Sequence, residues 1–496
     1  MQFKQLSCLL AGIAASAGIA GAPAPEKDFR LPEETFFRQN TDFRDNRRVF
    51  AWYMVCIGPY NGGWDAPVEE YKKQIRMAQS MGIDGFGLDV MRPNRQYKEA
   101  IAKIFQAARE LDSGFKLFFK FDYGSRDYEE QVADMVALLK QYGQDKCYEQ
   151  YQGKPLAGYY GVDLVIEENP SKSVKWWRDK VAPALKAANL DIFFVPTTFV
   201  QARKGGRQEA VNASVTEWGD LAQGMSIWQI QTSPFGGGLQ LLERQAQAQH
   251  KAGKAWMTTV SFHYWWGSNR SVPTSWLWMP GRPLKPEFAK NGTYYEHGGG
   301  KGLELQWRSV MEVQKPEWVM LLTWNDYNES YIEPVDDYKN YPNGTSDAPR
   351  GWYKPMAGLG ELNRYFIQHY KTGVQPEITA DSLFWCYRTS SQKLAASADP
   401  DRPPVKIGNG PVGDDLYLTT ALTAPAELRV NSGGRETRHS VPAGIGQTVV
   451  PFQPGRQQFS LWRDGKQLVE AEGEPVVDAI EFYCYWPTTG YATAGR

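Results

Sequence analysis

Short apolar runs alternate with longer amphipathic stretches between residues 49 and 324. We predict eight strands, at residues 49–57, 83–90, 115–123, 154–161, 190–199, 225–231, 255–264 and 317–325. Most stretches between them carry apolar residues at three- and four-residue spacing, which indicates helices at 69–82, 129–143, 238–253 and 303–314. The interval after the fifth strand offers only a short helix. Eight strands, each followed by a helix, are the number at which a parallel sheet closes into a (β/α)₈ TIM barrel.

A doubly wound open sheet is the competing α/β architecture. It lacks support, because no glycine-rich turn follows the first strand and no phosphate-binding motif occurs. From about Asp381 the pattern changes to short alternating runs between turns rich in glycine and proline, which predicts an all-β sandwich. We therefore expect a catalytic barrel at 46–378 and a sandwich at 379–496 that either braces the barrel or binds carbohydrate.

The N-terminus has the pattern of a secretory signal. Lys4 precedes an apolar run from Leu6 to Ile19, and small residues follow at 20–22. We expect a signal peptide at 1–22, an N-terminal linker at 23–45 and a secreted or periplasmic protein. No later stretch approaches the length of apolar chain that spans a membrane, so we expect no membrane partner. We also expect the protein to be a monomer.

Charge and composition narrow the partners. Lys and Arg number 55 and Asp and Glu 56, a net charge of −1, which argues against nucleic acid as a partner. Aromatic residues make up 14% of the chain, and flat rings suit the C–H faces of sugars, so a neutral polysaccharide fits better. No C-x-x-C spacing indicates a zinc site. Cys386 and Cys484 either form a disulfide or remain thiols.

The end of the eighth predicted strand carries the strongest candidate chemistry. The segment LLTWNDYNESYIEP (321–334) presents Asp326 and Glu329, flanked by Trp324 and Tyr327, which are candidate substrate-binding residues. Cleavage of a glycosidic bond needs one protonated carboxyl group and a second carboxylate, which this pair can supply. The two residues could instead cap the final helix. Their place at a barrel strand end among aromatic residues favours an active site.

Other strand ends add candidate substrate-binding residues, which are Tyr53, Trp228, His263, Tyr264 and Trp265. A Tyr-Trp-Trp run leaving a buried strand favours an exposed sugar platform, because buried Tyr and Trp need partners for their O–H and N–H groups. His263 would hydrogen-bond the substrate or orient a carboxylate. Glu167 and Glu168, after the fourth strand, offer an alternative acid or base, although a solvated loop explains them as well.

These motifs resemble a known family. LLTWNDYNESYIEP is similar to the WNDYGES-type motif of glycoside hydrolase family 71, the α-1,3-glucanases or mutanases. Residues 47–90 resemble that family's first βα unit, and residues 115–124 resemble its third strand. The resemblance covers about residues 45–375 and implies a TIM barrel, endo-hydrolysis of α-1,3-glucan with inversion, and no metal or cofactor.

The resemblance places the family's acidic pair on Asp326 and Glu329. Similarity to the related family 99 endo-mannosidases implies that Glu329 is the general acid and Asp326 the base. Asp122 matches an acidic position of the family, which implies that it binds a sugar hydroxyl or tunes the pair. Asp89, a further substrate-binding candidate, stands where the family more often has Asn, and Trp52 stands where it often has His. These two departures leave an α-mannan or another α-glucan open as the substrate. A non-catalytic secreted carbohydrate-binding protein is a separate alternative.

Overall fold

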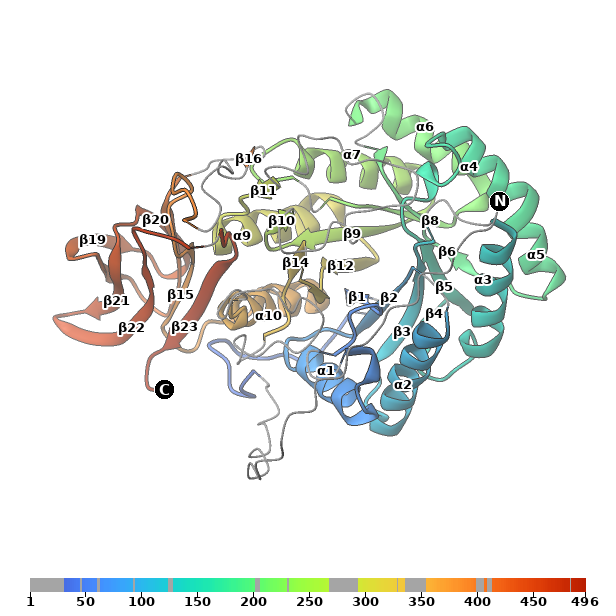
Figure 1. The fold of residues 1–496 in the computed structure, drawn as a ribbon. Helices are drawn as coiled ribbons and strands as arrows, with labels where there is room; N and C mark the ends of the chain where they lie inside the picture. The colour runs from blue at the N-terminus through green and yellow to red at the C-terminus, as the bar shows by residue number, and fades with distance from the viewer. Residues whose placement is uncertain are drawn as a thin grey trace, which may run out of the picture.

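The computed structural model describes residues 31–44, 47–59, 63–91, 94–123, 128–200, 206–229, 232–266, 293–327, 329–334, 354–397, 406–407, 413–481 and 483–496. The expected signal peptide at 1–22 lies outside this range. Figure 1 shows a barrel surrounded by helices and, beside it, a smaller β-sandwich built from the C-terminal part of the chain.

Eight parallel barrel strands confirm the predicted fold class. They are β1 (Arg48–Met54), β2 (Gly85–Val90), β3 (Lys116–Phe121), β5 (Lys154–Tyr159), the pair β6 (Phe193–Phe194) and β7 (Thr197–Thr198), β8 (Gly224–Ile227), β9 (Ala255–Ser261) and β12 (Trp318–Leu322). The fifth predicted strand is split around Pro196, which has no backbone N–H to donate. Its first half pairs with β5 and its second half with β8, which closes the ring. A short strand that we did not predict, β4 (Gln150–Tyr151), forms a hairpin with β5.

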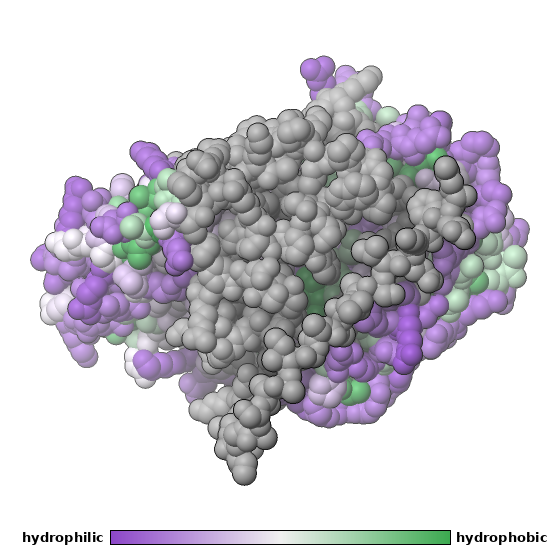
Figure 2. Space-filling view, viewed as in Figure 1, coloured by the Kyte–Doolittle hydropathy of each residue, from purple (hydrophilic) through white to green (hydrophobic). Residues whose placement is uncertain are grey.

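Helices cover the outside of the ring, and where Figure 2 shows them they present mostly hydrophilic residues to solvent. They are α1 (Val68–Ser80), α2 (Arg95–Leu111), α3 (Tyr128–Tyr142), α4 (Pro170–Trp176), α5 (Ala182–Ala187), α6 (Gln208–Trp218), α7 (Gly238–Lys251), α9 (Gly299–Ser309) and α10 (Ala357–Thr372). In α1 the apolar residues Tyr71, Ile75 and Ala78 recur at helical spacing and are buried. The interval after the fifth strand holds α6, which has 11 residues.

The C-terminal part folds into two antiparallel sheets, as its alternating pattern predicts. One has the order β20-β17-β15-β23 and the other β19-β18-β21-β22. Their strands are β15 (Ser382–Arg388), β17 (Asp415–Leu422), β18 (Ala426–Ser432), β19 (Arg435–Val441), β20 (Gly444–Pro451), β21 (Gly455–Arg463), β22 (Lys466–Val476) and β23 (Pro487–Thr493).

The sandwich packs on the barrel through α9 and α10, which lie between them in Figure 1. Phe384, Cys386 and Trp486 of the sandwich belong to the same buried cluster as the barrel core. Residues 31–44, expected as part of a linker, also pack here: Phe36 stacks on Tyr365 of α10 at 5.6 Å. The contacts fit the bracing role that we weighed for the sandwich.

Two observations bear on earlier expectations. Among the described residues, no disulfide joins Cys386 to Cys484, since Cys386 lies opposite Thr489 in the sheet. Within the same part of the chain, no helix is both long enough and apolar enough to cross a membrane.

Candidate active site

The chain leaving β12 forms a hairpin instead of a helix start. In it β13 (Asn325–Asp326) pairs antiparallel with β14 (Ser330–Tyr331), so that Asp326 lies opposite Ser330 and Glu329 lies in the connecting turn. Helix α10 begins only at Ala357, so neither carboxylate caps it. The Asp326 backbone N–H donates to the Thr323 hydroxyl at 2.8 Å, and that hydroxyl donates to the Ser330 carbonyl at 2.5 Å. We call residues 325–331 the acidic hairpin.

Asn325 ties the acidic hairpin to the end of β1. Its side-chain oxygen accepts a hydrogen bond from the Met54 N–H at 2.8 Å, and its amide nitrogen donates to the Gly58 carbonyl at 3.1 Å. The side chain is fully buried, so these bonds satisfy groups that water cannot reach. The hairpin is therefore anchored at the C-terminal mouth of the barrel.

Four carboxyl groups gather at this mouth. Burial, together with the charges of Asp326 and Asp122, raises the pKa of Glu329 well above its ordinary value. Burial and the charge of Asp122 also raise the pKa of Asp89 well above its ordinary value, with smaller contributions from Asp326 and Glu329. Like charges held close together disfavour ionisation of all the members at once, so Glu329 and Asp89 hold their protons to higher pH than isolated carboxyl groups do.

Asp89 is held by one hydrogen bond and leaves one oxygen unsatisfied. Its Oδ2 accepts from the Trp52 indole N–H at 2.7 Å. Its Oδ1 is buried and has no hydrogen-bond partner among the residues that the structure describes. A buried polar atom of this kind can take a hydrogen-bond partner from a bound molecule.

An aromatic group lies beside the carboxyls. The ring of Trp52 meets Trp228 edge to face at 5.0 Å and Tyr160 at 5.7 Å, and the rings of Tyr160 and Trp228 are 4.9 Å apart. Burial raises the pKa of the Tyr160 phenol well above its ordinary value, and Glu329, Asp122, Tyr264 and Asp89 add to the shift. The predicted candidates Trp228 and Tyr264 therefore lie near the carboxyl groups.

Lys120 of β3 lies inside the barrel. Its ammonium group lies 5.6 Å from the Trp52 ring centroid and donates to the Thr197 hydroxyl at 3.1 Å and to the Val195 carbonyl at 3.3 Å. Burial lowers the pKa of this lysine to about 7. Its chain fills the space beside Gly158, where an added Cβ would lie 2.4 Å from the lysine Cδ. The lysine thus supports the aromatic group from within the barrel.

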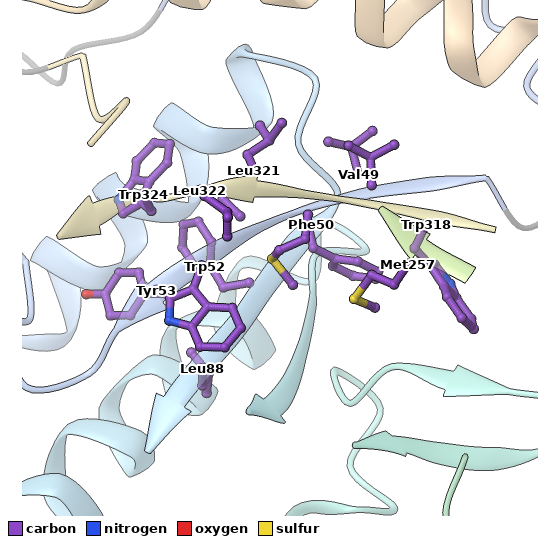
Figure 3. Packing of buried hydrophobic residues seen from close by; sticks show 14 of the residues in the cluster. Val49, Phe50, Trp52, Tyr53, Leu88, Met257, Trp318, Leu321, Leu322 and Trp324 are labelled. Atoms are coloured by element: carbon purple, nitrogen blue, oxygen red, sulfur yellow. The ribbon is translucent and has the colours of Figure 1, made fainter. Parts of the chain in front are cut away.

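Tyr53 and Trp324 lie in the layer between strands and helices, because neighbouring residues of a strand point to opposite faces. Both pack against Phe86, with ring centroids 4.9 Å and 5.2 Å from it. The Trp324 indole donates to Gln74 of α1 at 2.5 Å. Figure 3 shows Tyr53 and Trp324 at the same end of the strands as Trp52. The structure gives these two predicted substrate-binding residues a packing role behind the site.

Tyr327 connects the acidic hairpin to a buried carboxyl group. Its hydroxyl hydrogen-bonds Glu333, which also accepts from the Gln74 amide at 2.5 Å. Glu333 is fully buried, and burial raises its pKa from 4.5 to about 7 despite these two hydrogen bonds. Tyr327, predicted to bind substrate, thus directs its hydroxyl toward the protein interior.

Replacing Glu333 by Gln should change the pH dependence of stability. Between pH 4.5 and about 7 the unfolded chain loses the Glu333 proton before the folded one does, so wild-type stability falls as pH rises through this window. Glu333→Gln removes this charge and should be more stable than wild type by roughly 1–3 kcal/mol at pH 7.5, with a smaller difference at pH 5. Urea unfolding at several pH values measures the effect.

The control for this change is Glu377→Gln, which alters an exposed carboxylate paired with Arg38. That variant should follow the wild-type curve. If the free energy of unfolding varies with pH in the same way for Glu333→Gln and wild type, burial does not raise the pKa of Glu333.

His263 and Trp265 are covered by the sandwich. Burial lowers the pKa of His263 well below its ordinary value, and its ring meets Tyr331 and Trp486 edge to face at 5.3 and 5.0 Å. The Trp265 side chain is 1% exposed because Tyr485 and Trp486 pack on it at 5.5 and 5.0 Å. The structure therefore gives Trp265 a packing role in place of the predicted exposed platform. The side chain of Trp266 lies outside the described residues.

Two further comparisons complete the site. Glu167, an alternative acid or base, lies on an exposed loop and pairs with Lys172. Tyr160 was missed, although it stands directly after β5 in KPLAGYYG, the same kind of position as Asp122 after β3. Applying the strand-end rule to every strand would have found it.

Within the described ranges, no three His, Cys, Asp or Glu side chains are grouped to hold a metal ion.

The sequence is similar to known glycoside hydrolases. The sequence model of glycosyl hydrolase family 71 matches residues 45–495. A mutanase of Penicillium rubens is 24% identical over 443 residues, covering 86% of this chain and 85% of the relative. The glucan endo-1,3-alpha-glucosidase agn1 of Schizosaccharomyces pombe is 24% identical over 430 residues, covering 85% and 90%. Among solved structures, a GH99 endo-alpha-mannosidase from Bacteroides thetaiotaomicron aligns with a TM-score of 0.47 and 14% identity, covering 66% of this chain and 98% of that one.

Proposed function

Because the chain belongs to glycosyl hydrolase family 71, we propose that it hydrolyses α-1,3-linked glucan and that Asp326 and Glu329 are its catalytic pair. The observation that carries the pair is their place on one anchored hairpin, within electrostatic reach of Asp89 and Asp122 at the barrel mouth. The matched relatives are named for mutanase and endo-1,3-alpha-glucanase activity, which supports the linkage.

The electrostatics support the division of roles that the resemblance implies, with Glu329 as the acid and Asp326 as the base. Glu329 keeps its proton because burial and neighbouring carboxylates raise its pKa, so it can donate that proton to the glycosidic oxygen as the C–O bond breaks. Asp326 accepts a proton from the water whose oxygen attacks the anomeric carbon. The negative charge of Asp326 favours the positive charge that develops on the sugar ring in the transition state. Afterwards Asp326 releases its proton to solvent and Glu329 takes one up, which restores both groups.

The aromatic group supports a sugar substrate. Tyr160 is half-buried and stands edge to face with Trp52 and Trp228 beside the carboxyls. The partly exposed Tyr160 ring can contact the C–H groups of a pyranose ring, while the buried rings of Trp52 and Trp228 hold it in place. The unsatisfied Asp89 Oδ1 can hydrogen-bond a sugar hydroxyl, and the resemblance implies the same role for Asp122.

Product analysis tests the proposal. Purified protein is incubated with insoluble α-1,3-glucan and, in parallel, with α-1,4-glucan, α-1,6-glucan and α-mannan, while proton NMR follows the first anomer released. We expect oligosaccharides from α-1,3-glucan alone, with the β anomer appearing first, since inversion reverses an α linkage. Release from α-mannan alone would replace the proposed substrate, and the α anomer appearing first would replace inversion by retention.

The site of action is a second part of the proposal. We propose that the protein is secreted as a monomer after removal of residues 1–22, since its polymeric substrate cannot enter a cell. N-terminal sequencing of the exported protein and its mass in solution test both points. A mature protein that begins at Met1 would refute the signal.

A further inference from the structure

The acidic hairpin has a back face that is formed by the sandwich. Tyr331 of β14 is fully buried, and its ring meets Trp486 at 5.4 Å in an edge-to-face contact. His263 packs between the same two residues, 5.3 Å from Tyr331 and 5.0 Å from Trp486. The strand of the hairpin that follows Glu329 therefore rests on Trp486, which directly precedes β23 of the sandwich.

The backbone of Glu329 is held through the same residues. The Trp265 N–H of β10 (Tyr264–Trp266) donates to the Glu329 carbonyl at 2.9 Å. The Trp265 ring in turn packs edge to face on Tyr485 and Trp486. The position of the proposed acid thus depends on a tryptophan that the sandwich covers.

A polar chain of contacts joins the two parts independently. The Tyr331 hydroxyl donates to the Lys354 carbonyl at 2.9 Å and accepts from its N–H at 2.7 Å. The Lys354 ammonium pairs with Glu474 of β22 at 2.5 Å, and the same carboxylate accepts from Thr488 at 2.9 Å. The hairpin is therefore fixed to the sandwich on both its apolar and its polar side.

We infer that Tyr485 and Trp486 of the sandwich are positioning residues for the reaction, which hold the acidic hairpin so that Asp326 and Glu329 meet one glycosidic linkage. The inference rests on the proposed function of that pair. Positioning at this level matters because a catalytic group displaced by about 1 Å can lose roughly 100-fold in rate. The sandwich is then part of the catalytic machinery, and not only a brace.

Packing, not hydrogen bonding, carries the role of Trp486. Its indole nitrogen has no hydrogen-bond partner among the described residues, so Phe can replace the ring contacts without losing a bond. Leu keeps the site apolar but removes the edge-to-face geometry with Tyr331, His263 and Trp265. Tyr491 of β23 offers a matched control, because it stacks on Phe384 at 5.9 Å within the same interface and, among the described residues, makes no ring contact with Tyr331, His263 or Trp265.

The test compares Trp486→Leu, Trp486→Phe and Tyr491→Leu in the full chain, using soluble α-1,3-linked glucose oligomers. We expect Trp486→Leu to lower kcat about 10- to 100-fold with little change in KM, and to move the alkaline limb of the pH–rate profile toward lower pH, as a loosened hairpin hydrates Glu329. Trp486→Phe should recover most of kcat. Tyr491→Leu should lose thermal stability but keep kcat.

Two outcomes would overturn the inference. One is an unchanged kcat in folded Trp486→Leu. The other is that kcat falls in both Trp486→Leu and Tyr491→Leu in proportion to the thermal stability that each variant loses. If Asp326→Asn and Glu329→Gln are also fully active, the proposed function itself fails. If those two are inactive while Trp486→Leu is normal, only the positioning role fails.

Discussion

Glu329→Gln is expected to lower kcat on α-1,3-glucan by about 10²–10⁴-fold, with substrate binding retained. Gln has nearly the shape of the protonated carboxyl but cannot give its proton to the glycosidic oxygen. Asp326→Asn should lose a comparable factor, because an amide cannot take a proton from the attacking water. Initial rates from reducing-end release, together with glucan binding by sedimentation, measure both quantities.

The two variants should differ on substrates with a good leaving group. An activated aryl glycoside needs little protonation, so it should restore much of the rate to Glu329→Gln and little to Asp326→Asn. In wild type the alkaline limb of kcat should report loss of the Glu329 proton, and it should lie above the ordinary range of a carboxyl because burial and Asp326 raise that pKa. Glu329→Gln should lack this limb.

The matched control is Glu167→Gln, which makes the same substitution on the exposed loop after β5. Its kcat should equal that of wild type. Full activity of Glu329→Gln with loss of activity in Glu167→Gln would move the acid to that loop and refute the proposed pair.

The barrel could be predicted from sequence because its signal is local. Each strand is a short apolar run, and each of the predicted strands has a counterpart in the ring. The split of the fifth strand at Pro196 follows from the missing N–H of proline, but which neighbour each half would pair with depends on closure of the whole ring.

The candidate site was predictable as far as strand ends define it. Asp89 and Asp122 stand at or directly after the C-terminal ends of β2 and β3, Asp326 lies in the hairpin that follows β12, and the barrel brings these ends together. What could not be predicted is which aromatic faces other parts of the chain cover. Trp265 has the sequence pattern of an exposed platform, and only the position of Trp486, far along the chain, shows that its ring is packed.

The junction of barrel and sandwich contains a buried cation that sequence reasoning did not single out. Arg388 at the end of β15 is 2% exposed and donates to the Gly413 carbonyl at 2.6 Å and to Asp414 at 3.2 Å. Glu296 of the barrel lies 3.8 Å from the same guanidinium group and accepts from the Tyr294 hydroxyl at 2.8 Å. One arginine thus neutralises a carboxylate from each part of the molecule.

Arg388→Met is therefore expected to destabilise the protein by about 3–5 kcal/mol, because it leaves the buried carboxylate of Glu296 and the half-buried carboxylate of Asp414 without their cation. Adding Glu296→Gln should recover part of that loss by removing one unpaired charge. Urea unfolding at neutral pH, followed by tryptophan fluorescence, measures the free energy of unfolding of each variant.

Arg456→Met is the matched control, since it makes the same substitution in an exposed pair with Glu472 on the outer sheet of the sandwich. Water solvates both charges of that pair, so no measurable change in stability is expected. Equal losses in the two Arg→Met variants would mean that the arginine stem, and not the buried charge, stabilises the junction. Glu296 also accepts 2.8 Å hydrogen bonds from the Tyr294 hydroxyl and the Gly298 N–H. If adding Glu296→Gln to Arg388→Met lowers the free energy of unfolding further, these hydrogen bonds, and not Arg388, stabilise the buried Glu296 carboxylate.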